Sequence, residues 1–127
     1  MTPDTLDLAR RAVACPGWRW MPGMRDTDGW RILRGEEASG GASLASADGE
    51  LMHDRSLSLR VLPDLTDAAT LGCLLALVRE AWGDAAASAH LVGFTHALEW
   101  AVMSDESELA TGPTEAAALV AALEAAP

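Results

Sequence analysis

The feature that most constrains the fold is an unbroken apolar stripe in the middle of the chain. Its five members recur at helical spacing, and they are Leu71, Leu74, Leu75, Val78 and Trp82. Asp67 is the expected N-cap of this helix, and Gly83 is its expected end. We expect the last four members of the stripe to be largely buried against a sheet. Gly72 lies inside the helix, where glycine is unfavourable, so it predicts a close approach of another backbone.

Two further helices are predicted near the ends of the chain. Thr2 precedes Pro3, and Thr114 precedes Glu115, which is the pattern of an N-cap followed by a first helical turn. Between the helices, alternating apolar residues predict strands over 18–21, 30–34, 57–61, 92–102 and 108–111. The segment 92–102 is either one long strand or two short ones broken near 96–97. The order of elements favours an α+β fold, with a single antiparallel sheet of about four to six strands packed by three amphipathic helices.

A chain of 127 residues is long enough for one core and too short for two, so residues 1–127 are expected to form a single domain. Residues 35–50 are rich in Gly, Ser and Ala and have no period, which predicts a flexible surface loop. No apolar run reaches the length of a membrane span, and the first ten residues lack the apolar core of a secretory signal. We therefore expect a cytoplasmic protein.

Charge is distributed unevenly along the chain. Nineteen acids oppose nine bases, all of them arginine, for a net charge of −10. Residues 80–127 contain acids but no Arg or Lys. This balance argues against direct binding to nucleic acid or to an anionic membrane. The acidic third is either an interaction surface for a basic partner or a solvated face that keeps an alanine-rich chain soluble, and both interpretations stay open.

No motif in the sequence points to catalysis, a metal or a cofactor. Cys15 and Cys73 are far apart, and none of the three histidines has ligand spacing to either. A nucleophile elbow and a Gly-rich phosphate loop are both absent. The pattern favours a non-enzymatic protein without a cofactor or a metal site.

Tryptophan is unusually frequent, with five Trp beside one Phe and no Tyr. Trp20, Trp30, Trp82 and Trp100 fall at periodic positions and are expected in the core. Trp18 is expected there too, although a tryptophan beside a loop can instead anchor an interface.

Several motifs resemble small proteins of tailed phages and prophages. They are the run Trp-Arg-Trp-Met-Pro-Gly-Met over 18–24, the run Leu-Pro-Asp-Leu-Thr-Asp over 62–67 that leads to Ala-Trp-Gly at 81–83, and the alanine-rich end from Thr114. The Pro-Asp…Thr-Asp entry to a helix is also similar to that of the phage α-β-α sandwich domain. The resemblance implies a phage context and carries no catalytic residues.

These observations favour an acidic inhibitor of a host nucleic-acid-handling protein, of the anti-CRISPR or anti-restriction kind. Its carboxylates would take the place of phosphates in a basic groove of a nuclease or CRISPR effector. The expected partner-binding residues are Glu99, Asp105, Glu106, Glu108 and Trp18. The alternatives are a structural or assembly accessory of a virion and an antitoxin-like regulatory partner.

Overall fold

The computed structural model describes residues 2–34, 41–57, 61–93, 98–105 and 107–127. Its three helices begin where the caps predict: α1 (Pro3–Val13), α2 (Ala68–Trp82) and α3 (Glu115–Ala125). Thr2, Asp67 and Thr114 each accept a hydrogen bond from the backbone N–H three residues later. Gly83 ends α2 in the left-handed conformation, with φ of 63°. The local signals for helix starts are therefore confirmed.

The first sheet contains β1 (Arg31–Arg34), β2 (Ala42–Ala45) and β3 (Leu51–Arg55), all antiparallel and in that order. Strand β2 corrects the expected loop over 35–50, because Ala42 and Leu44 are buried in a ladder between two strands. Residues 35–40 lie outside the described part of the chain. Small residues are compatible with a short buried strand when neighbouring strands supply the hydrogen bonds, and composition alone does not reveal those neighbours.

One predicted strand of the first half needs correction, and another lies mostly outside the described residues. Residues 18–21 pair with no strand, because the turn at Pro22 and Gly23 brings the next residues beside β1 instead. The backbone N–H of Gly23 donates to the carbonyl of Ile32, and that of Ile32 donates to the carbonyl of Met24. In the predicted strand over 57–61, residues 58–60 are not described, and 57 and 61 lie outside any strand. The strand in this part of the chain is β3, which the apolar alternation did not indicate.

The second sheet contains β4 (Ser88–Val92), β5 (Glu99–Ser104) and β6 (Ser107–Gly112), again antiparallel and in chain order. The segment 92–102 is thus divided between two strands, with residues 94–97 outside the described part. The predicted return strand over 108–111 is confirmed within β6. Val102 and Trp100 face α3, since Val102 belongs to the buried core and Trp100 packs against it.

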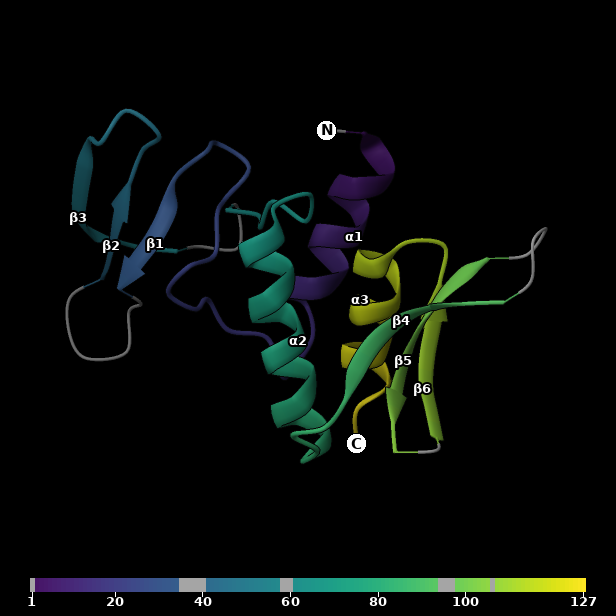
Figure 1. Ribbon diagram of the computed structural model, residues 1–127. Coiled ribbons are helices and arrows are strands. Elements are labelled where there is room, and N and C mark those ends of the chain that lie inside the picture. The colour runs from purple at the N-terminus through teal and green to yellow at the C-terminus, as the bar shows by residue number, and fades with distance from the viewer. Residues whose placement is uncertain (1, 35–40, 58–60, 94–97, 106) are drawn as a thin grey trace.

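The six strands form two sheets that lie on opposite sides of the helices (Figure 1). The α+β class is confirmed, but the single sheet of four to six strands is wrong. The physical reason is the position of α2 in the chain: it follows β3 and precedes β4, and the helix lies between the two groups of strands (Figure 1). One hydrophobic cluster nevertheless includes side chains from both halves, among them Ile32, Leu44, Leu74, Val102 and Leu119.

The stripe of α2 is confirmed in part. Leu74 and Val78 are fully buried, whereas Leu75 and Trp82 are only partly buried and pack at the edge of the core. Leu77, outside the stripe, is buried instead. Burial extends around α2 because the helix contacts α3 on one side, where the indole N–H of Trp82 donates to the carbonyl of Ala122 at 2.8 Å.

Two glycines show where backbones do and do not meet. Apart from the chain neighbours of Gly72 and the backbone of its own helix, no described atom lies within 4 Å of the position that a Cβ would take there, so the close approach of another backbone predicted at Gly72 is wrong. The close approach occurs at Gly112 of β6, where a Cβ would lie 2.7 Å from the backbone nitrogen of Ala118. Gly112 therefore allows α3 to pack directly on the second sheet.

Candidate functional site

The acids of the C-terminal third divide into two groups. Glu124 of α3 forms a bidentate ion pair with Arg11 of α1, and Glu80 of α2 pairs with Arg19. The hydrogen bonds from Arg11 lower the pKa of Glu124 below its ordinary value. These two carboxylates connect parts of the chain that are distant in sequence, so they have a structural partner. Asp84 accepts the backbone N–H of Ala86 in the turn before β4.

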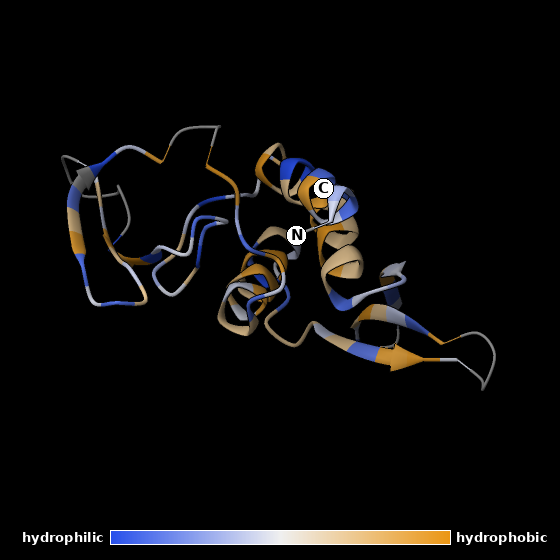
Figure 2. Cartoon of the chain, turned by 90° about the horizontal axis from the view of Figure 1, so that it is seen from above, coloured by the Kyte–Doolittle hydropathy of each residue, from blue (hydrophilic) through white to orange (hydrophobic). Residues whose placement is uncertain are grey.

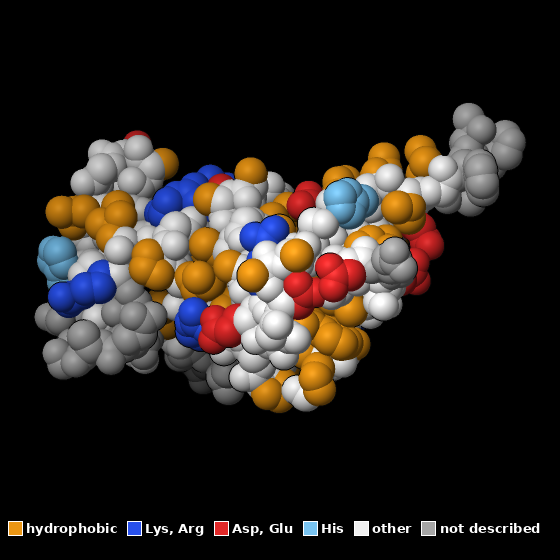
Figure 3. All heavy atoms as spheres, turned by 60° about the horizontal axis from the view of Figure 1, so that its bottom comes forward, with side chains coloured by type: hydrophobic (Ala, Val, Ile, Leu, Met, Phe, Trp, Pro, Cys, Tyr) orange, Lys and Arg blue, Asp and Glu red, His pale blue; other side chains and the backbone are white. Residues whose placement is uncertain are grey.

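The acids of the second sheet have no such partner. Glu99, Asp105 and Glu108 are exposed and make no hydrogen bond or ion pair with any described residue. In Figure 3 the acidic side chains at the right, on the side of the second sheet, stand without an arginine beside them. All nine arginines precede residue 80, so residues 80–127 contain no Arg or Lys that could pair with these three acids.

The register of the second sheet places two of these acids on one face. Glu108 lies opposite Met103, which shares its face of β5 with Glu99. Trp100 and Val102 point the other way, towards α3, so Glu99 and Glu108 lie on the outer face. Met103 lies four positions after Glu99 along β5, so the two residues are about 13 Å apart along the strand.

Asp105 occupies the turn between β5 and β6, with a left-handed φ of 49°. It lies at the same end of the sheet as Glu108, while Glu99 begins β5 at the other end. The predicted residue Glu106 lies outside the described part of the chain. The structure thus places Asp105 and Glu108 at one end of the second sheet and Glu99 at the other end.

Trp18 lies apart from this acidic surface. Its ring is partly buried, packs against the core, and meets the ring of Trp20 edge to face with 5.4 Å between the centroids. Its indole Nε1 is buried and has no hydrogen-bond partner among the described residues. This position agrees with the expectation that Trp18 belongs to the core.

Charged side chains of the first half join the first sheet to α2. Arg31 pairs with Asp67 and Arg25 pairs with Asp64, while the Thr70 hydroxyl accepts the backbone N–H of Arg25. The Arg31 guanidinium holds the pKa of Asp67 far below its ordinary value. Burial raises the pKa of Asp64, but hydrogen bonds from Thr66 and Arg25 outweigh it and lower the pKa. Asp64 and Asp67 therefore stabilise the contact between the segment before α2 and the residues in and beside β1.

Asp26 is almost fully buried in the same region. Its carboxylate accepts the backbone N–H groups of Asp28 and Trp30, which closes the turn before β1. Burial raises the pKa of Asp26, although these backbone hydrogen bonds act in the opposite direction. Its role is that of a turn former, as its position between turn residues predicts.

Two serine–histidine contacts were not predicted from the sequence. Ser88 Oγ lies 2.6 Å from His90 Nε2 on β4, and Ser43 Oγ lies 3.2 Å from His53 Nδ1 across β2 and β3. In the described part of the chain neither imidazole contacts a carboxylate that would orient it for nucleophilic catalysis. The Ser88–His90 contact follows from strand parity, whereas the other depends on strand pairing. The described residues also contain no group of three His, Cys, Asp or Glu side chains that could hold a metal ion.

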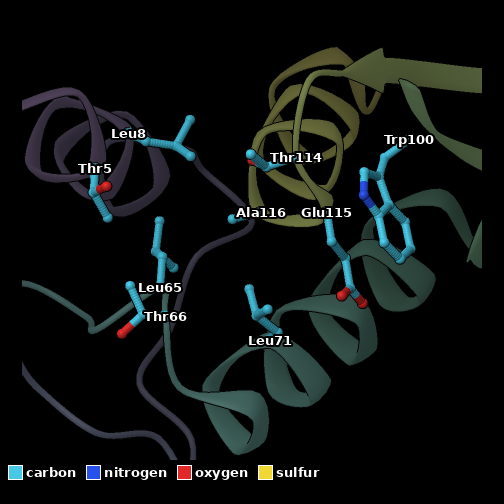
Figure 4. Close-up of a pocket in the computed structure, with 9 residues that line it drawn as sticks. All are labelled: Thr5, Leu8, Leu65, Thr66, Leu71, Trp100, Thr114, Glu115 and Ala116. Atoms are coloured by element: carbon cyan, nitrogen blue, oxygen red, sulfur yellow. The ribbon is translucent and has the colours of Figure 1, made fainter. Parts of the chain in front are cut away.

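A pocket of about 330 Å³ opens between the starts of α1 and α3, the segment before α2, and β5. Its nine lining residues are Thr5, Leu8, Leu65, Thr66, Leu71, Trp100, Thr114, Glu115 and Ala116 (Figure 4). Glu115 is the only charged residue among them. Sequence reasoning missed this pocket because its walls come from four separate segments of the chain.

No family model, no curated protein and no solved structure matches this chain. None of the described helices is long and apolar enough to span a membrane.

Proposed function

We propose that this chain is a non-enzymatic acidic protein, of phage or prophage type, that binds and inhibits a basic nucleic-acid-handling protein of a bacterial host. The observation that carries the proposal is the division of the acids. Glu80 and Glu124 are neutralised by arginines, whereas Glu99, Asp105 and Glu108 remain unpaired on one sheet. Unpaired exposed carboxylates raise the negative potential around that sheet and attract a basic surface.

The binding surface consists of the outer face of the second sheet together with the β5–β6 turn. Carboxylates on a rigid sheet can form charge-assisted hydrogen bonds with arginine and lysine side chains that otherwise hold phosphates. Such charges mainly accelerate association, and salt weakens the effect because the charges are exposed. Five arginines of the first half, Arg10, Arg11, Arg19, Arg25 and Arg31, are engaged in internal ion pairs, none of them with an acid of the second sheet.

The test replaces Glu99, Asp105 and Glu108 together by Gln, Asn and Gln. Asn is suited to the left-handed backbone at Asp105. Tagged protein is used to capture partners from a bacterial lysate at low salt, and bound proteins are identified by mass spectrometry. We expect the native chain to retain a basic nucleic-acid-binding protein that salt or a double-stranded DNA oligonucleotide releases, and we expect the triple variant to lose it.

The matched control replaces Asp4, Asp48 and Glu50 by Asn, Asn and Gln. These three acids are also exposed but lie on α1 and in the turn between β2 and β3, and the net charge changes by the same amount. The control variant should retain the partner. Equal capture by all three proteins, or release that is insensitive to salt and DNA, would contradict the proposal.

A second candidate function is that of an assembly accessory of a virion. Leu91 and Leu98 are 54% and 57% exposed, on strands β4 and just before β5. This end of the second sheet extends away from the helices (Figure 2). Light scattering coupled to size-exclusion chromatography separates the two functions: large particles support assembly, and a small discrete species supports the inhibitor.

A further inference from the structure

The pocket between α1, α2, α3 and β5 combines an apolar lining with one carboxylate. Leu8, Leu65, Leu71 and Ala116 provide aliphatic walls, and Trp100 adds an indole ring. In Figure 4 the side chains of Glu115 and Trp100 lie side by side at one end of the pocket, across from Leu8 and Leu65. A ligand that fits must therefore have an apolar stem and one cationic end.

Some polar groups of the lining already form hydrogen bonds within the chain, and others do not. The hydroxyls of Thr5, Thr66 and Thr114 all form hydrogen bonds within the chain, with Thr2, Asp64 and the N–H of Ala117. The Glu115 carboxylate and the Trp100 indole N–H form no hydrogen bond or ion pair with any described residue, and the Trp100 N–H is open to solvent rather than buried. One unpaired acceptor and one unpaired donor are thus left for a ligand.

We infer that this pocket binds an arginine side chain presented by a basic protein. Its guanidinium would pair with Glu115 beside the ring of Trp100, and its methylene stem would lie along Leu71 and Leu65. Arginine fits better than lysine because its planar guanidinium can bind a carboxylate through two hydrogen bonds and stacks against aromatic rings. The volume of about 330 Å³ leaves room for one arginine side chain.

That the arginine comes from the partner rests on the proposed function, whereas the chemistry of the pocket does not. The pocket and the acidic outer face share β5, because Trp100 and Glu99 are neighbours that point to opposite faces of the sheet. A partner that reaches around this strand can occupy both surfaces.

The experiment uses a small probe, so that it needs no identified partner. The full-length protein, labelled with 15N, is titrated with N-acetyl-arginine methylamide while the indole N–H signals of the five tryptophans are recorded by NMR. A Trp100→Phe variant identifies the signal of Trp100. We expect this signal to shift with saturation in the millimolar range, as one side chain contributes only part of an interface.

Two comparisons make the test specific. N-acetyl-citrulline methylamide has nearly the same shape without the charge, and it should bind at least about tenfold more weakly, since the charge-assisted pair is lost. A Glu115→Gln variant should lose arginine binding to a similar extent, while Glu50→Gln, which removes an exposed acid outside the pocket and outside the second sheet, should not. The other four indole signals report whether each variant remains folded.

Equal shifts with arginine and citrulline, or unchanged binding by Glu115→Gln, would overturn the inference. Tighter binding of the corresponding lysine amide would overturn the choice of a guanidinium. Failure of the proposed function is seen separately, in the capture experiment with the outer-face triple variant, because that variant leaves Glu115 and Trp100 in place.

Discussion

The two sheets are similar in size and topology but are attached to the helices by different interactions. The first sheet contributes Ile32 and Leu44 to the core, and in addition its Arg31 forms an ion pair with Asp67 at the start of α2. The second sheet is joined to α3 by direct packing, with Gly112 against the helix backbone and Val102 in the core. The difference shows that ion pairs attach the first sheet to the helices, whereas the acids of the second sheet take no part in its attachment and stay unpaired.

The largest effect is expected where packing alone holds the second sheet. Leu119 of α3 is fully buried, so Leu119→Ala should reduce the free energy of unfolding by about 2–5 kcal/mol. Urea titration followed by tryptophan fluorescence measures this loss. Leu33→Ala serves as the control, because Leu33 is 51% exposed and should cost little. A loss below about 1 kcal/mol for Leu119→Ala would show that α3 does not hold the sheet.

A smaller effect is expected from the ion pairs of the first sheet. Asp67→Ala removes the cap of α2 together with the partner of Arg31, and should cost about 1–3 kcal/mol. Asp67→Asn keeps a capping side chain and removes the charge, so it should cost less. In the Asp67→Ala variant, amide hydrogen exchange should accelerate more in β1 and β2 than in β5 and β6, relative to the unmodified protein. Uniform acceleration across both sheets would contradict the separate attachment of the two.

The smallest effect is expected from acidification. Asp64 and Asp67 have pKa values below the ordinary value of 3.8, so their contribution to stability is present above that pH and is lost as the pH falls below it. The raised pKa of Asp26 acts in the opposite direction and offsets part of the loss. We expect the hydrogen-exchange protection factors, which are corrected for the intrinsic pH dependence of amide exchange, to fall in the first sheet below about pH 4 before they fall in the second sheet. A simultaneous fall in both sheets would remove this distinction.

The unpaired acids extend the comparison to function. Sequence reasoning identified Glu99, Asp105 and Glu108 as candidates for binding because they lie on or beside probable strands. It placed Glu80 and Glu124 on helices instead, but it could not show which arginine each of them would meet. Only the fold brings Arg19 and Arg11 to those two helical acids. The pairing of charges between distant segments is what distinguishes a structural carboxylate from an available one.

The sequence by itself determined the helices, because a helix forms its hydrogen bonds between neighbouring residues. The caps at Thr2, Asp67 and Thr114 therefore act within one turn and are visible without the fold. Strands depend on partners elsewhere in the chain, so only the tertiary structure decided that β2 lies within a Gly-rich segment and that six strands divide into two sheets. The pocket at Trp100 and Glu115 has the same origin, since its walls meet only when α1, α2, α3 and β5 have packed together.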